Sequence, residues 1–315
     1  MKKTLMLGLA CLMSVSLMAC GSNEGSSNGV SGEIAVYTRD SSSGTREAFE
    51  KGVGFEGELT KHATEVTSND DMAAKVGGEA RGIGYTSLST DFEKNNVKPL
   101  KYEGVEASSE TVLDGSYGLQ RPFMFVTRAS GDFESEEKEQ LVAAFLDYLQ
   151  NSAEGMAVVQ KAGGEVDLSK AVAWEELASK YPVLQQDNSD ITITTAGSTS
   201  VEKTLKAALE AFSPLAGNVK FVMNQNGSGD AVPRTLGKEK DGANKADIGF
   251  ASRAFKEDGS EDIASAMVSG QYCIDAVVAV VHKDNPLEDI TQAQLHTGAA
   301  KRYFYREDNK LGRFK

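Results

Sequence analysis

Cysteine, proline and positive charge are all scarce in this chain of 315 residues. It contains 3 cysteines and 6 prolines, and its 33 lysines and arginines are outnumbered by 46 aspartates and glutamates, for a formal net charge of −13. Three cysteines are too few for a disulfide framework. A nucleic-acid partner is excluded because it needs clustered basic residues, and the sequence has no such stripe. A small anionic ligand is still compatible with this charge, since backbone N–H groups and helix N-termini can hold one.

The signatures of common enzyme sites are missing as well. The sequence has no Walker A loop, no His-Glu-x-x-His, no Cys-x-x-Cys pair and no Gly-x-Ser-x-Gly elbow at its turns. Its histidines, His62, His282 and His296, lack metal-ligand spacing. Ser43 and Ser228 are conceivable nucleophiles, but the sequence places no base beside them. We expect no catalytic residue, no metal and no cofactor, and keep a secreted serine phosphatase or hydrolase as the enzyme alternative.

The first 32 residues are typical of an export signal followed by a tether. Lys2 and Lys3 precede an apolar run, residues 5–18, that is shorter than the ~20 residues needed to span a bilayer. The run ends in Leu-Met-Ala-Cys-Gly, which resembles a bacterial lipobox with Cys20 as the acylated residue. We therefore expect a signal peptide at 1–19 and a lipid-anchored flexible tether at 20–32. An ordinary cleaved signal peptide is the alternative.

Beyond the tether, strand and helix patterns alternate, which predicts an α/β fold. Residues 135–151 are typical of a helix capped by a serine, with acidic residues in the first turn and one apolar face. Two further helices are expected at 45–51 and 201–212. Strands are expected at 34–38, 82–88, 121–127, 190–195, 218–224, 247–251 and 274–281.

Three turns rich in small residues occur beside these strands. They are Arg-Asp-Ser-Ser-Ser-Gly-Thr at 39–45, Ala-Gly-Ser-Thr-Ser at 196–200 and Asn-Gly-Ser-Gly at 226–229. A helix N-terminus offers unpaired N–H donors, glycine allows close approach, and serine and threonine add hydroxyl donors. Such turns also serve simply as helix caps. Three of them, one with an arginine, indicate a site for an oxyanion.

At these residues the sequence resembles the phosphate-binding lipoproteins of bacterial ABC phosphate importers. The resemblance rests on I-x-x-A-G-S-T-S-V at 193–201, N-G-S-G at 226–229, A-D-I-G-F-A-S-R at 246–253, D-A-V-V-A-V-V-H-K-D-N-P-L at 275–287, T-R-D-S-S-S-G-T-R-E-A-F-E at 38–50, G-I-G-Y-T-S-L at 82–88 and Y-G-L-Q-R-P-F-M-F-V-T at 117–127. It implies a two-lobed periplasmic-binding-protein-like fold of type II. It also implies a phosphate held by Arg39, Ser43, Gly44 and Thr45 from one side and by Thr199, Ser200 and Ser228 from the other.

The order of the matching segments differs from that in the family. Residues 34–128 resemble the later part of the family and residues 190–295 the earlier part, which predicts a circular permutation. The expected lobes are 33–116 plus 276–315 (lobe A) and 117–275 (lobe B). One allowed back-translation of 301–315, read one nucleotide later, gives K-D-I-F-T-G-K-I-T-N-W-E-D-L, a segment that resembles the family's continuation. We therefore also expect a frameshift near residue 301, with 301–315 as an out-of-frame tail.

Arg253 stands where some family members have an aspartate that accepts a proton of phosphate. It is expected to act as a second cation for the anion or, equally, as a salt bridge at the cleft rim. Asp230, Asp247 and Asp275 are alternative acceptors. The selectivity for phosphate over sulfate or molybdate is therefore open at this stage.

The resemblance implies a protein on the outer face of the cell membrane, anchored by lipid, that delivers phosphate to ABC permease and ATPase subunits. The alternatives are a binder of another oxyanion, the secreted hydrolase, and a phosphate-sensing or adhesive surface protein.

Overall fold

The computed structural model describes residues 34–296. The predicted signal peptide, Cys20 and the tether lie outside these residues, as does the predicted out-of-frame tail at 301–315. No helix within 34–296 has both the length and the apolar character required to cross a bilayer.

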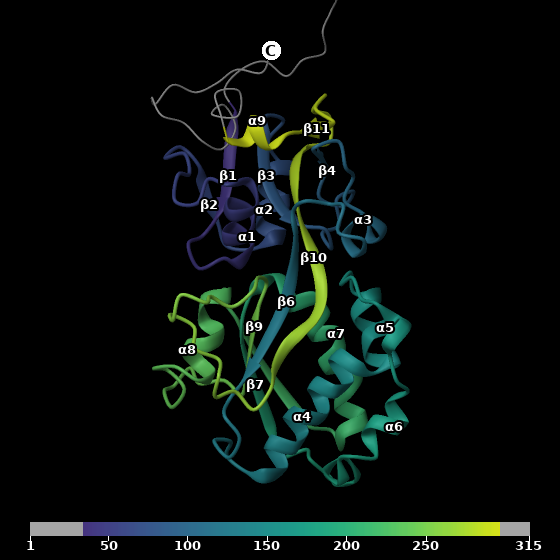
Figure 1. Ribbon diagram of the computed structural model, residues 1–315. Coiled ribbons are helices and arrows are strands. Elements are labelled where there is room, and N and C mark those ends of the chain that lie inside the picture. Colours follow the sequence, from purple (N-terminus) through teal and green to yellow (C-terminus); the bar gives the residue numbers. More distant parts are fainter. Residues whose placement is uncertain (1–33, 297–315) are drawn as a thin grey trace, which may run out of the picture.

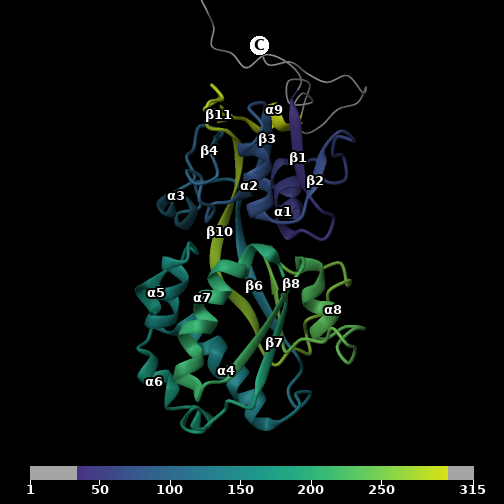
Figure 2. The ribbon, with the colours of Figure 1, turned by 180° about the vertical axis from the view of Figure 1, so that it is seen from behind.

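The chain forms two lobes, seen as the upper and lower halves of the ribbon in Figures 1 and 2. One continuous ladder of strands joins them in the order β2-β1-β3-β10-β6-β9-β7-β8, with β4 paired to β10 on the side. The ladder strands are β1 (Ala35–Arg39), β2 (Thr64–Val66), β3 (Gly82–Ser87), β4 (Val97–Pro99), β6 (Gln120–Thr127), β7 (Thr192–Gly197), β8 (Lys220–Gln225), β9 (Ile248–Ala251) and β10 (Ser269–His282). A separate pair consists of β5 (Lys101–Tyr102) and β11 (Asp289–Ile290).

Lobe A is the half whose main core lies in residues 34–119 and 276–295. β1 pairs in parallel with β2 and β3, and the last part of β10 runs antiparallel to β3. A smaller apolar cluster around Met72 and Val280 adds a second packed layer. The helices of lobe A are α1 (Gly44–Val53), α2 (Asn69–Gly77), α3 (Ser109–Leu113) and α9 (Gln292–His296).

Lobe B is the half whose main core lies in residues 123–273. β7 pairs in parallel with β8 and β9, and β6 runs antiparallel to β9. A second cluster beneath α8 includes Val126, Val232 and Phe255. The helices of lobe B are α4 (Glu136–Asn151), α5 (Ala153–Lys161), α6 (Trp174–Ala178), α7 (Glu202–Phe212) and α8 (Ala231–Thr235), and its short 3₁₀ turns are η1 (Leu168–Lys170), η2 (Pro182–Gln185), η3 (Thr199–Val201), η4 (Ser213–Ala216) and η5 (Ser228–Asp230).

Two antiparallel strands, β6 and β10, connect the lobes (Figure 1). Residues 269–276 of β10 pair with β6, whereas Val277–Val281 pair with β3 of lobe A. The pairing partner of β10 therefore changes between Ala276 and Val277, at the junction of the two halves. The boundaries at 117 and 276 and the permuted order of the segments stay predictions.

The expected helices and strands are present, with small shifts at their ends. Helix 135–151 is confirmed as α4, and the Ser135 side chain caps it by accepting a hydrogen bond from the Lys138 N–H. The expected strand 274–281 is longer than predicted, since β10 starts at Ser269. Its first three residues, Ser-Gly-Gln, have no large apolar side chain and are at least partly exposed, so no local hydrophobic pattern predicts a strand there.

Candidate functional site

The three small-residue turns predicted from the sequence all lie at the carboxyl ends of parallel strands. Residues 40–43 follow β1 and lead into α1, η3 follows β7 and leads into α7, and η5 follows β8 and leads into α8. The first turn belongs to lobe A and the other two to lobe B. In an open α/β sheet this edge is where ligands bind.

The turns touch across the boundary between the lobes. The hydroxyls of Thr45 and Ser200 are hydrogen-bonded at 2.6 Å, and Nη2 of Arg39 donates to Oγ1 of Thr199 at 2.8 Å. Gly44 packs so tightly against the third turn that a Cβ at this position would lie 2.1 Å from Oγ of Ser228. The structure therefore brings together six of the eight predicted residues through direct contacts between the lobes.

The seventh predicted residue, Ser43, lies in the same turn and acts as the N-cap of α1. Its Oγ accepts a hydrogen bond from the Arg46 N–H at 3.3 Å, and its side chain is buried. This is the helix-capping role expected of serine at such a position. The cap fixes the direction in which the N–H groups of the first turn of α1 point.

Arg39 carries a positive charge that its neighbours compensate only weakly. The residue is fully buried, and its guanidinium donates to Oδ1 of Asn69 at 3.0 Å, the Thr67 carbonyl at 2.9 Å and the Thr199 hydroxyl. All three acceptors are neutral, and its Nε has no hydrogen-bond partner. Asp40, at 3.6 Å and partly exposed, is its nearest carboxylate. A buried cation with neutral partners favours an anionic ligand.

The electrostatics of Arg39 agree with this description. Burial lowers the pKa of its guanidinium from the ordinary value, Asp40 partly opposes this effect, and Arg121 lowers it further. Arg121 and Arg39 therefore repel each other within the same buried region. An anion placed among their donors relieves this repulsion.

Serine hydroxyls that the sequence analysis did not single out complete the site in lobe B. Oγ of Ser198 donates to Oγ of Ser252 at 2.8 Å, and Oγ of Ser228 lies 3.3 Å from the same atom. The Ser252 N–H also donates to Ser228, at 3.0 Å. Beneath this cluster, Nη1 of Arg121 donates to Ser252 at 3.3 Å. Ser198 and Ser252 lie inside the quoted motifs, directly beside the predicted residues Thr199 and Arg253. Their positions in these motifs could therefore have marked them as candidate site residues.

Asn69 is a further addition from lobe A. It accepts from Arg39, and its amide lies 3.3 Å from Oγ of Ser200, so it joins the turns of both lobes. It is the first residue of α2, directly after the N-cap Ser68. In sequence it resembles an ordinary helix start, and nothing there marks it as a site residue.

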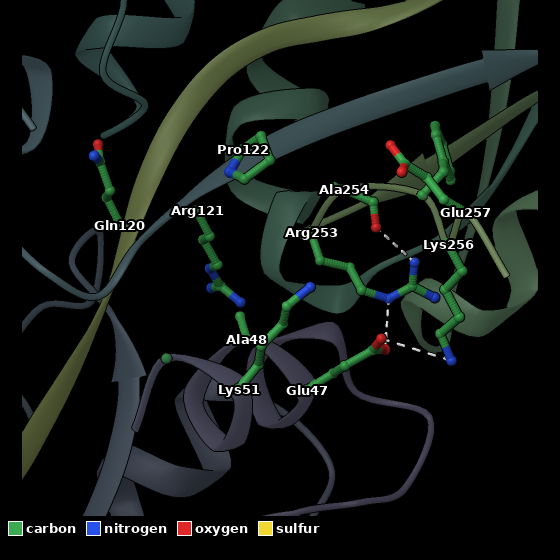
Figure 3. Close-up of a pocket in the computed structure, with 12 residues that line it drawn as sticks. Glu47, Ala48, Lys51, Gln120, Arg121, Pro122, Arg253, Ala254, Lys256 and Glu257 are labelled. Atoms are coloured by element: carbon green, nitrogen blue, oxygen red, sulfur yellow. Dashed lines mark hydrogen bonds and ion pairs between the residues drawn. The ribbon is translucent and has the colours of Figure 1, made fainter. Parts of the chain in front are cut away.

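Arg253 makes no hydrogen bond to any of the predicted donors. Its guanidinium instead forms two hydrogen bonds to the Glu261 carboxylate, at 2.8 and 2.7 Å. It also forms an ion pair of 2.6 Å with Glu47, which Figure 3 shows. Arg253 and Glu47 border a cavity of about 450 Å³ between α1, the start of β6 and residues 253–257. Of the two roles expected for Arg253, the geometry is that of the salt bridge.

The three aspartates considered as proton acceptors are already paired. Asp275 accepts two hydrogen bonds from Arg121, at 3.1 and 2.7 Å, and one from Ser87 at 2.8 Å. Asp247 lies 2.9 Å from Nζ of Lys138, and Asp230 lies 2.7 Å from Arg234. Only Asp275 is linked to the site, through Arg121 and Ser252.

Residues 34–296 contain no group of three or more histidines, cysteines or acidic residues suited to hold a metal ion. Within the same residues, neither Ser43 nor Ser228 is hydrogen-bonded to a histidine. The arrangement is therefore one of binding donors contributed by two lobes, without an activated nucleophile. These features define a class: a two-lobed α/β binding protein with an anion site in the cleft.

Comparisons with known proteins agree with this class. The chain belongs to the PBP superfamily, whose domain model matches residues 22–154 and 182–297. It is 32% identical over 308 residues to the phosphate-binding protein PstS 2 of Streptococcus agalactiae serotype V, covering 94% of each chain. It is 30% identical over 303 residues to PstS 2 of Streptococcus pneumoniae serotype 4, covering 93% of this chain and 94% of the relative.

A solved structure supports the same grouping. The crystal structure of the phosphate-binding protein of a phosphate ABC transporter from Streptococcus pneumoniae TIGR4 matches with a TM-score of 0.60 and 29% identity, over 84% of this chain and 94% of that one. The predicted two-lobed α/β fold and the family resemblance are thereby confirmed.

Proposed function

We propose that this protein captures inorganic phosphate between its two lobes and delivers it to the permease and ATPase subunits of an ABC importer. The observation that carries the proposal is Arg39, a buried cation whose hydrogen-bond acceptors are all neutral and whose nearest carboxylate, Asp40, lies 3.6 Å away, surrounded by hydroxyls from both lobes. The relatives named as phosphate-binding proteins, which align over nearly the whole chain, support it. They are binding proteins, and we propose no catalytic activity for this chain.

Capture follows from the arrangement of donors. Arg39 supplies charge-assisted hydrogen bonds, and the hydroxyls of Thr45, Thr199, Ser200 and Ser228 supply neutral ones. The N–H groups at the start of α1, beside Gly44, add the positive end of a helix. A divalent anion leaves water only if nearly all its oxygens find donors, which is why so many small donors gather at one point.

Closure brings these donors together. We propose that lobe A (33–116 plus 276–315) and lobe B (117–275) move as two bodies about β6 and β10, because these two strands connect them. An anion that contacts donors of both lobes stabilises the closed arrangement and shifts the population toward it.

The protein acts outside the cytoplasm, as PstS-type binding proteins do. We propose that Cys20 carries the lipid anchor and that residues 20–32 tether the lobes to the outer face of the membrane. The basic start, the short apolar run and the Leu-Met-Ala-Cys-Gly sequence support this. Metabolic labelling with a palmitate analogue tests it: Cys20→Ala abolishes the label if the proposal is right.

Titration calorimetry of the chain from residue 21 onward with phosphate, sulfate and arsenate tests the ligand. We expect binding of phosphate and of arsenate, which has the same shape and protonation, and weaker binding of sulfate. Sulfate is a real competitor, because the three aspartates considered as acceptors are all paired. Absence of phosphate binding contradicts the proposal, and equal affinity for sulfate contradicts its selectivity.

A further inference from the structure

A cluster of ion pairs joins the two lobes beside the anion site. Nε of Arg253, in lobe B, lies 2.6 Å from Oε2 of Glu47 on α1 of lobe A. Lys256, also in lobe B, lies 3.6 Å from the other oxygen of Glu47. Figure 3 shows Glu47 reaching from α1 toward both cations. None of these groups belongs to the donors assigned to phosphate above.

Arg253 is fixed within lobe B independently of lobe A. Its two-point contact with Glu261 lies entirely in lobe B, and Glu261 also accepts a hydrogen bond from the Lys256 N–H at 2.8 Å. Burial by itself raises the pKa of Glu261, but Arg253 and that N–H hold it below its ordinary value, so the carboxylate is ionised at neutral pH. The guanidinium is thus held in position whether or not Glu47 is present.

The contact with Glu47 is therefore the contact of Arg253 that crosses between the lobes. Glu47 lies in the first turn of α1, where its N–H donates to the Ser43 carbonyl at 3.1 Å. Gly44, at the start of the same helix, packs on Ser228 and Ser252, and Arg253 directly follows Ser252. In the structure the Glu47–Arg253 ion pair is present together with the contacts between the donors of the two lobes.

We propose that the Glu47–Arg253 ion pair is a latch that holds the lobes closed and sets the rate at which the bound anion leaves. Glu47 and Arg253 are then positioning residues that do not touch the anion. The inference rests on the proposed function, since it concerns release from the same cleft. A contact made after encounter affects dissociation much more than association.

Glu47→Gln distinguishes the latch from direct binding of the anion by Arg253, because the two roles predict opposite changes in phosphate affinity. If Arg253 bound the anion, removing the nearby negative charge would strengthen phosphate binding. The latch predicts weaker binding, with about a fivefold higher dissociation rate and an unchanged association rate. The substitution leaves no buried charge unpaired, since Arg253 keeps Glu261, so we expect a normal fold.

Glu65→Gln is the matched control. Glu65 is in lobe A, carries the same charge and, within residues 34–296, forms its ion pair with Arg46 of its own lobe. We would measure phosphate affinity by calorimetry and dissociation by chasing radiolabelled phosphate with unlabelled phosphate. A double-mutant cycle with Arg253→Lys tests the pair, because a latch makes the two effects non-additive.

The outcomes separate the two proposals. If the wild-type protein binds no phosphate, the proposed function fails. If it binds phosphate but Glu47→Gln binds as tightly as Glu65→Gln, or more tightly, the latch is overturned. A higher dissociation rate in Glu47→Gln alone, with non-additivity toward Arg253→Lys, supports it.

Discussion

Gly44 offers a direct way to separate closure of the lobes from folding. A Cβ at this position would lie 2.1 Å from Oγ and 2.9 Å from Cβ of Ser228, and 2.7 Å from Oγ of Ser252. Rotating the Ser228 hydroxyl away does not remove the clash, because its Cβ is also too close. Gly44→Ala therefore acts as a wedge between the lobes. Gly44 begins a helix, where alanine is at least as favourable as glycine.

The expected loss of affinity follows from the contacts that the wedge breaks. Restoring ordinary van der Waals distance moves the turns apart by about 1 Å. The 2.6 Å contact between Thr45 and Ser200 and the 2.8 Å contact between Arg39 and Thr199 then exceed hydrogen-bonding distance. One neutral and one charged hydrogen bond together contribute about 3 kcal/mol, so phosphate affinity should fall roughly 100-fold.

Gly229→Ala is the matched control, because a Cβ at Gly229 meets no atom within 4 Å. Calorimetry gives the affinity for phosphate, and thermal unfolding of the ligand-free protein gives the stability. We expect both variants to unfold near the wild-type temperature and only Gly44→Ala to lose affinity. Equal affinities of the two variants, or a large loss of stability in Gly44→Ala, would refute the wedge argument.

Three further predictions concern charged groups. Arg39→Lys keeps the charge but loses the forked donors, so phosphate affinity should fall by about 2 kcal/mol, or about 30-fold, in calorimetry; an unchanged affinity contradicts the role of Arg39. Arg121→Met leaves Asp275 buried and unpaired, and urea unfolding should show a loss of about 3–5 kcal/mol, largely recovered when Asp275→Leu is added. Burial by itself raises the pKa of Glu261, but Arg253 holds that pKa below its ordinary value of 4.5. The ionised carboxylate therefore stabilises the folded protein fully above pH 4.5, and this stabilisation is lost as the pH falls through the lowered pKa. Urea unfolding between pH 7 and pH 3 should therefore show a steeper decline for the wild type than for Glu261→Gln.

Much of the fold could be predicted because local patterns and tertiary structure agree. The cap Ser135 and the apolar face of α4 are local signals, and Leu141, Phe145 and Leu149 are buried as the pattern requires. The end of β10 that enters lobe A is a run of valines and alanines that reads as a strand. The start of the same strand depends on pairing with β6, which no local pattern encodes.

The candidate site was partly predictable for the same reason. Gly44, Thr45 and Ser228 lie in turns whose composition alone suggests anion binding. Asn69 does not, because its role depends on packing that brings α2 beside Arg39. The role of Arg253 could not be predicted either. Its charge is evident from the sequence, but its partner Glu47 belongs to the other lobe, and no local pattern indicates that pairing.

The arrangement of the two cores has a consequence for how the chain is made. The core of lobe B comes from one uninterrupted stretch, residues 123–273, whereas the core of lobe A combines residues 34–119 with residues 276–295. During synthesis from the N-terminus, all core residues of lobe B are made before Val277–Val281, the part of β10 that pairs with β3 of lobe A. Until then, the edge of β3 that pairs with β10 lacks its partner strand. We expect lobe B to become protease-resistant first, and lobe A to be the half that needs protection from aggregation during export.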